Sequence, residues 1–161
     1  MIAALLLAAA SQVPATPVVV VTVPEPEEVR LVAGEKGEVC LVATIRSGFR
    51  IQANPASEPY LVPANVSFEE DEHVRLGSPE YPPGKPHRLR GASSDLSIYE
   101  ESVTIRVPVE ASSSEVPSSG LDVVLDGSLV YQACNNAICL KPSSAPVRIR
   151  LRIRPVEVPA R

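Results

Sequence analysis

The chain has 161 residues, of which 45% are hydrophobic and 21% charged, so it can bury the core of one folded domain and is not a disordered chain. Its formal net charge of −4 gives no reason to expect nucleic-acid binding. Seventeen prolines, many valines and an aromatic content of only 4% are typical of short strands joined by proline-rich turns.

Residues 2–10 form an unbroken apolar run, and Ala8 and Ala10 supply the small residues of a signal-peptidase site before Ser11. The run is far too short to cross a bilayer. Residues 1–10 are therefore expected to be the signal peptide of an exported, periplasmic and soluble protein, with a disordered alanine-rich tail as the alternative. Four prolines mark 11–27 as a linker in which 18–21 would at most add an edge strand, so the folded domain is expected to cover 28–161.

From residue 28 onward, apolar residues recur at every second position, which predicts strands and not helices. Over 38–46, Val39 and Leu41 lie on one face and Cys40 and Val42 on the other. This strand is therefore expected to be covered on both sides, with Cys40 as a buried, inert thiol. Further strands are predicted at 49–53, 65–70 and 73–76.

The second half of the chain continues the pattern after an interruption. Repeated prolines predict a long loop without regular structure over 77–97. Residues 102–110 alternate again, and 121–134 are predicted to form a hairpin around Asp126-Gly127, a dipeptide that suits a type I′ turn. The last strand, at 147–154, alternates apolar residues with four arginines, which predicts a solvated basic face. Seven or more short strands predict an all-β, immunoglobulin-like antiparallel β-sandwich.

The chemistry of the chain is expected at Cys134 and Cys139, which are separated by four residues that include the turn-prone pair Asn135-Asn136. A tight turn here would bring the two sulfurs within reach of a disulfide. Because so small a ring removes little freedom from the unfolded chain, the bond would stabilise the fold only weakly. This favours thiol–disulfide exchange with other proteins. A fixed structural clip, or a pair of buried thiols, fits the spacing equally well.

Three side chains near the cysteines are candidates for a supporting role. Lys141 could stabilise a thiolate, with a solvated lysine as the alternative. Tyr131 and Tyr99 could shield or hydrogen-bond the sulfurs, or could belong to ordinary core packing. No metal or other cofactor is expected, because His73 and His87 lie far apart in the sequence and there is no zinc spacing or nucleotide-binding loop.

The segment 131–142, YQACNNAICLKP, resembles the active hairpin of the N-terminal periplasmic domain of the thiol:disulfide interchange protein DsbD family. GFRIQ at 48–52, YLVP at 60–63, YP at 81–82 and the strand region at 98–109 resemble other parts of that domain in the same order. Together these stretches extend the resemblance over about residues 28–153.

The resemblance implies an immunoglobulin-like domain that relays reducing equivalents. They would pass from a separate membrane-embedded electron carrier to thioredoxin-like or other extracytoplasmic thiol proteins. Cys139 would form the intermolecular disulfide and Cys134 would resolve it. A cap loop, at the position of 87–97, would shield the pair, with Leu96 replacing the aromatic residues of the family. The chain would then be a protein-disulfide reductase component. The alternative is a non-catalytic immunoglobulin-like binding or structural module with a fixed hairpin disulfide.

Overall fold

The computed structural model describes residues 18–89, 91–113 and 116–157, and within these ranges the chain forms strands and loops without a helix. None of the described segments is therefore a helix long and apolar enough to span a membrane. The expected signal peptide at 1–10 lies outside the described residues. The strands are β1 (Val21–Thr22), β2 (Val29–Val32), β3 (Lys36–Ile45), β4 (Arg50–Gln52), β5 (Asn65–Phe68), β6 (Val74–Leu76), β7 (Lys85–His87), β8 (Leu96–Tyr99), β9 (Ser102–Ala111), β10 (Leu121–Tyr131), β11 (Ala133–Cys134) and β12 (Ser143–Arg154).

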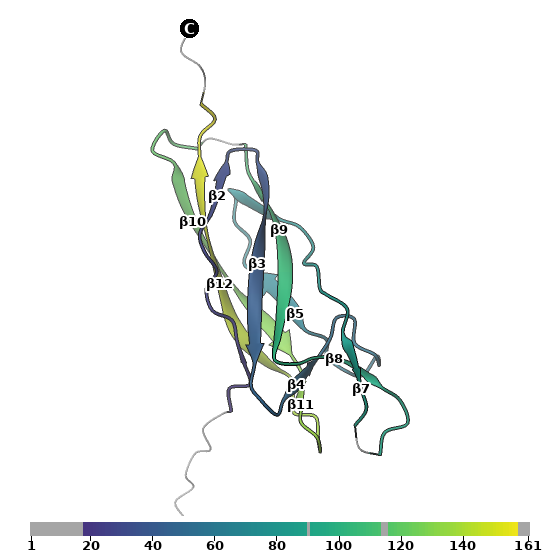
Figure 1. Ribbon diagram of the computed structural model, residues 1–161. Helices are drawn as coiled ribbons and strands as arrows, with labels where there is room; N and C mark the ends of the chain where they lie inside the picture. The colour runs from purple at the N-terminus through teal and green to yellow at the C-terminus, as the bar shows by residue number, and fades with distance from the viewer. Residues whose placement is uncertain (1–17, 90, 114–115, 158–161) are drawn as a thin grey trace, which may run out of the picture.

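The strands form a sandwich with a small additional sheet at one end (Figure 1). One layer has the strand order β1-β3-β9-β6 and the other β2-β12-β10-β5. The pairing is antiparallel apart from β2 with β12, which run parallel. The third sheet, β11-β4-β8-β7, lies beyond the lower end of the sandwich in Figure 1. The predicted all-β sandwich of immunoglobulin-like type is confirmed.

Alternation of apolar and polar residues explains why the long strands form and pack. In β9 and β12 every second side chain is buried in one core, and the residues between them face solvent. The arginines of β12 form the predicted solvated face, where Arg148 pairs with Asp126 at 2.6 Å and Arg152 with Asp122 at 2.6 Å. Such exposed pairs add little stability, so the buried face of each strand holds the layers together. The buried face of β12 consists of Ala145, Val147, Ile149, Leu151 and Ile153.

The predicted hairpin turn at Asp126-Gly127 is wrong, because β10 passes through this dipeptide without a break. Gly127 faces Val147 of β12 on one side and Phe68 of β5 on the other. A Cβ at Gly127 would collide with the Ser67 carbonyl oxygen and the Phe68 ring. The glycine therefore allows close approach of a neighbouring strand, which is a second reason for glycine in a strand besides turn formation.

Three further expectations are corrected by the structure. The prolines of 77–97 do not prevent regular structure, since β7 contains Pro86 and pairs with β8 at the sheet edge, where a missing N–H is tolerated. Cys40 is exposed and Val42 is 43% exposed, so β3 is covered on one face only. Part of the expected linker belongs to the fold, because Val20 and Val21 are buried in the core and β1 pairs with β3.

Candidate functional site

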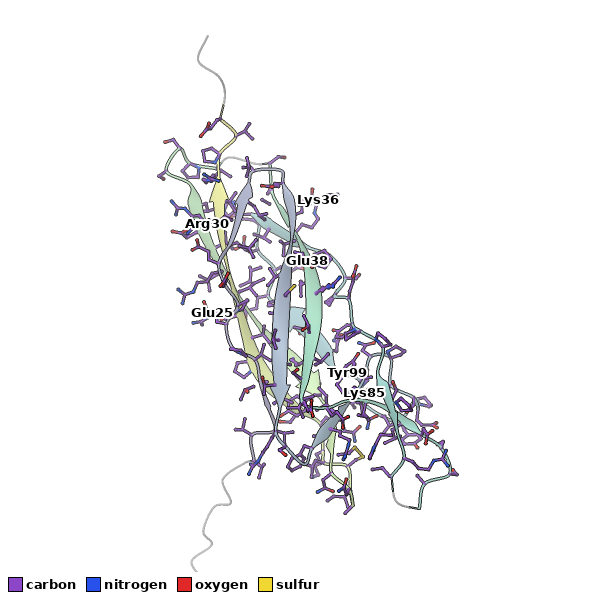
Figure 2. The ribbon with its side chains drawn as sticks, in the orientation of Figure 1. Glu25, Arg30, Lys36, Glu38, Lys85 and Tyr99 are labelled. Carbon is purple, nitrogen blue, oxygen red and sulfur yellow. A yellow bond between two sulfur atoms is a disulfide. The ribbon has the colours of Figure 1, made fainter. Side chains whose placement is uncertain are left out.

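The small end sheet brings four distant parts of the chain together around the cysteine hairpin. In it, β11 pairs with β4, which places Cys134 opposite Arg50. On its other edge β4 pairs with β8, which pairs in turn with β7. Figure 2 shows Tyr99 and Lys85, from β8 and β7, at this end of the molecule and far from Lys36.

The hairpin that follows β11 is a tight turn closed by backbone and side-chain hydrogen bonds. The Leu140 N–H donates to the Ala133 carbonyl at 2.7 Å, and the Asn135 N–H donates to the Ile138 carbonyl at 2.9 Å. The Asn135 side-chain oxygen accepts the N–H groups of Ala137 at 2.8 Å and Ile138 at 2.9 Å. An asparagine that caps the turn in this way explains why the sequence Asn135-Asn136 bends the chain here.

Between these two hydrogen-bonded pairs, Cys134 and Cys139 face each other and form a disulfide, with their Cα atoms 3.9 Å apart. The two sulfurs have unequal surroundings. Cys134 is 2% exposed, whereas Cys139 is partly exposed and follows Ile138, which is 58% exposed at the tip of the hairpin. Of the two cysteines, Cys139 is therefore the one more accessible from solvent.

Gln52 lies against the buried sulfur. Its side-chain Nε2 donates a hydrogen bond to Cys134 Sγ at 3.2 Å, and the residue is 0% exposed. Its Oε1 has no hydrogen-bond partner within the described residues. The Gln52 backbone is held firmly, because its N–H donates to the Gln132 carbonyl at 3.0 Å and its carbonyl accepts the Ala64 N–H at 3.1 Å.

Arg50 of β4 lies opposite Cys134 in the pairing of β4 with β11, and its charged side chain contacts the hairpin. Its Nη1 donates to the Asn136 side-chain oxygen at 2.9 Å, which fixes the tip of the turn. Its Nε lies 3.5 Å from a carboxylate oxygen of Glu100, whose other oxygen lies 3.5 Å from Lys85 Nζ. Sequence reasoning missed both Arg50 and Gln52. The sequence offered no clear signal, because Arg50 and Gln52 alternate with the apolar residues Phe49, Ile51 and Ala53, as polar residues on the solvent face of a strand would.

The two candidate tyrosines make structural contacts: Tyr99 belongs to β8 of the end sheet, and Tyr131 is the last residue of β10. The Tyr99 hydroxyl donates to the Pro82 carbonyl at 2.7 Å and accepts the Asn54 N–H at 3.2 Å. It therefore connects the loop that follows β4 to the loop that precedes β7. Burial raises the pKa of Tyr99 and keeps it a neutral donor. Tyr131 is 4% exposed and packs in the main core.

The expected cap position forms the loop of the β7–β8 hairpin. Leu96 is 7% exposed and lies opposite His87. Arg88 and Asp95 close the base of the loop with an ion pair of 2.7 Å. An open depression of about 630 Å³ separates this loop from the cysteine hairpin, lined by His87, Arg88, Leu89, Asn136 and Ala137. The cap loop thus faces the tip of the hairpin across a space that solvent can enter.

The remaining candidate, Lys141, is exposed just beyond the hairpin. The part of the chain that the structure describes contains no group of three or more His, Cys, Asp or Glu side chains arranged to hold a metal ion. Cys40, the third cysteine, lies on the outer face of β3, in a sheet other than that of the hairpin.

Comparison with known proteins identifies the family of this chain. No similar sequence was found among curated proteins. Among solved structures, the chain is similar to the seventh ScaB type I cohesin from Pseudobacteroides cellulosolvens, with 9% identity and a TM-score of 0.43 over 87% of this chain and 94% of the cohesin. The family model of the N-terminal part of the thiol:disulfide interchange protein DsbD matches residues 28–150, which include the complete cysteine hairpin. The chain therefore belongs to the family of the N-terminal domain of the thiol:disulfide interchange protein DsbD.

Proposed function

We propose that this domain relays reducing equivalents from a membrane-embedded electron carrier to thioredoxin-like or other extracytoplasmic thiol proteins, through Cys134 and Cys139. Membership of a thiol:disulfide interchange family supports the chemistry. An exported, periplasmic location belongs to the proposal, because a protein disulfide and thiol partners of this kind persist outside the cytoplasm.

Two electrons enter and leave through the same sulfur. A thiolate of the carrier attacks Cys139 Sγ, the bond to Cys134 breaks with its electron pair on Cys134, and the second carrier thiolate resolves the mixed disulfide. The domain is then a dithiol and the carrier a disulfide. In the second half of the cycle, the Cys139 thiolate attacks a disulfide of the partner and forms a mixed disulfide with it. The Cys134 thiolate then attacks Cys139 Sγ, which releases the partner as a dithiol and re-forms the disulfide between Cys134 and Cys139.

The observation that carries the proposal is the unequal exposure of the two cysteines. A disulfide that serves only as a clip has no need of an accessible sulfur at the tip of a projecting turn. Here Cys139 is partly exposed, and Cys134 is 2% exposed directly beneath it. This arrangement supports attack from outside at Cys139, with Cys134 as the resolving thiol.

A matched pair of variants tests the proposal. Because Cys40 is an exposed free thiol, both variants are made with Cys40→Ser. Cys134→Ala leaves Cys139 unpaired and is expected to displace thionitrobenzoate from a thioredoxin whose single remaining active-site cysteine carries that group as a mixed disulfide. The resulting reducible disulfide between the two proteins is seen on non-reducing gels and by mass spectrometry. Cys139→Ala, whose remaining sulfur is buried, is expected to form far less. Equal trapping by the two variants, or none by either while both are folded, would contradict the proposed role.

The reduction potential of the wild-type disulfide separates this function from a fixed structural clip. Structural disulfides of exported proteins have potentials below about −300 mV, and exchange-competent ones lie higher. We expect a value above that limit from equilibration with a glutathione or dithiothreitol redox series. A lower value would assign the hairpin to the binding or structural module considered as the alternative.

A further inference from the structure

We propose that Gln52 is a further catalytic residue, whose side-chain amide stabilises the Cys134 sulfur as the leaving thiolate when the disulfide is reduced. This inference rests on the proposed function, since it concerns the same disulfide. It adds a role that neither the cysteine pair nor the family match assigns.

The burial of Gln52 has no sufficient structural explanation. It is the one buried polar side chain among the described residues, and its Oε1 has no partner there. A buried amide with an unpaired oxygen is destabilising, and an apolar side chain of similar size would pack there without that penalty. The side-chain contact that the amide does make is with Cys134 Sγ, at 3.2 Å.

The contact acts on the step in which charge develops on Cys134. An attacking thiolate forms a bond to Cys139 Sγ, the bond between the two cysteines breaks, and its electron pair remains on Cys134 Sγ. No proton has to move in this step. Since Cys134 is 2% exposed, water cannot solvate the new charge freely, and the Gln52 N–H is a donor already in place. A stabilised thiolate leaves faster and has a lower pKa.

Gln132 provides a matched control, because it is another glutamine at the same hairpin with a purely structural set of contacts. Its Oε1 accepts the Val62 N–H at 2.9 Å, and its Nε2 donates to the Leu140 carbonyl at 3.3 Å. Replacement of Gln132 thus loosens the base of the hairpin and leaves the amide at Cys134 unchanged.

The experiment measures how fast dithiothreitol reduces the oxidised domain, with Cys40→Ser in every variant, by acid quenching, alkylation and mass spectrometry. Gln52→Leu is expected to slow reduction by about tenfold, the effect of one hydrogen bond to a charged group. Gln52→Met, which also lacks the donor, is the second variant if leucine does not fold. In the single-thiol form with Cys139→Ala, Gln52→Leu is expected to raise the pKa of Cys134, followed by the ultraviolet absorbance of the thiolate.

A folded Gln52 variant that is reduced at the wild-type rate would overturn the inference, as would an unchanged pKa of Cys134. Equal slowing by Gln132→Leu would overturn it as well, because general loosening of the hairpin would then explain the result. Failure of the proposed function would look different. In that case Cys134→Ala would not trap thioredoxin, whereas the effect of Gln52 on reduction by a small dithiol would remain.

Discussion

Gly127 offers a direct test of the architecture, because the structure assigns it to the middle of β10 and not to a turn. Replacing it with alanine adds one methyl group between β10 and β5. The new Cβ would lie 2.6 Å from Phe68 Cδ1 and 3.0 Å from Phe68 Cγ, and still closer to the Ser67 carbonyl oxygen. Carbon atoms pack at about 3.5–4.0 Å, so β5 must move away by about 1 Å.

The expected loss of stability follows from what β5 contributes. This strand pairs with β10 along one edge and buries Val66, which is 4% exposed, in the core. Overpacking costs about 1–3 kcal/mol, and weakening the strand pairing costs about 1 kcal/mol more. Alanine recovers about 0.4–1 kcal/mol by restricting the unfolded chain. The free energy of unfolding should therefore fall by about 2–3 kcal/mol.

Urea unfolding of the oxidised protein, followed by far-UV circular dichroism, measures this effect as a fall in the midpoint of about 1–2 M. Gly48→Ala is the matched control, because Gly48 has a φ of 83° and a Cβ added there would meet nothing within 4 Å. That variant makes no new steric contact, and its cost is that of holding alanine in the left-handed conformation, about 1 kcal/mol. A Gly127→Ala protein as stable as wild type, or no less stable than Gly48→Ala, would refute the close packing of β5 on β10.

Two further predictions concern the surface and the backbone. The hydrogen bond from Arg148 lowers the pKa of Asp126, so their interaction stabilises the fold above the ordinary aspartate pKa and is lost as the pH falls through the lowered value. The difference in melting temperature between wild type and Asp126→Asn should thus be present at neutral pH and should shrink as the pH falls below about 4. A difference that does not depend on pH would contradict this pairing. Glu101 has a φ of 63°, so replacing it with glycine should raise the free energy of unfolding of the protein by about 0.5–1 kcal/mol. A lower free energy of unfolding, measured by chemical denaturation, would show that the side chain of Glu101 matters more than its backbone conformation.

Local pattern was enough to predict most of the long strands and the bend of the cysteine hairpin. β9 and β12 follow strict alternation, and that period depends only on the geometry of an extended chain. The turn at Asn135-Asn136 is also local, since the Asn135 side chain closes it within three residues. The spacing of Cys134 and Cys139 made a disulfide possible from neighbouring residues alone, with a pair of buried thiols as the alternative, and the structure contains the disulfide.

The features that sequence reasoning missed depend on contacts between distant segments. Gly127 lies within a continuous strand, and not in a turn, in a place where β5, about 60 residues earlier in the chain, packs against it. Cys40 is exposed because none of the described strands covers the outer face of β3. Gln52 meets Cys134 across 82 positions of sequence, by way of the pairing of β4 with β11.

Most of the long strands and the place where the cysteine hairpin bends can be predicted from neighbouring residues, because these features depend on φ/ψ preferences and side-chain alternation over short stretches. Only the packing of the sheets decides that Cys134 is the buried cysteine and that its sulfur contacts the Gln52 amide. Exposure and a partner for a buried atom are set by which strands become neighbours, and that choice is made by the packing of the whole core.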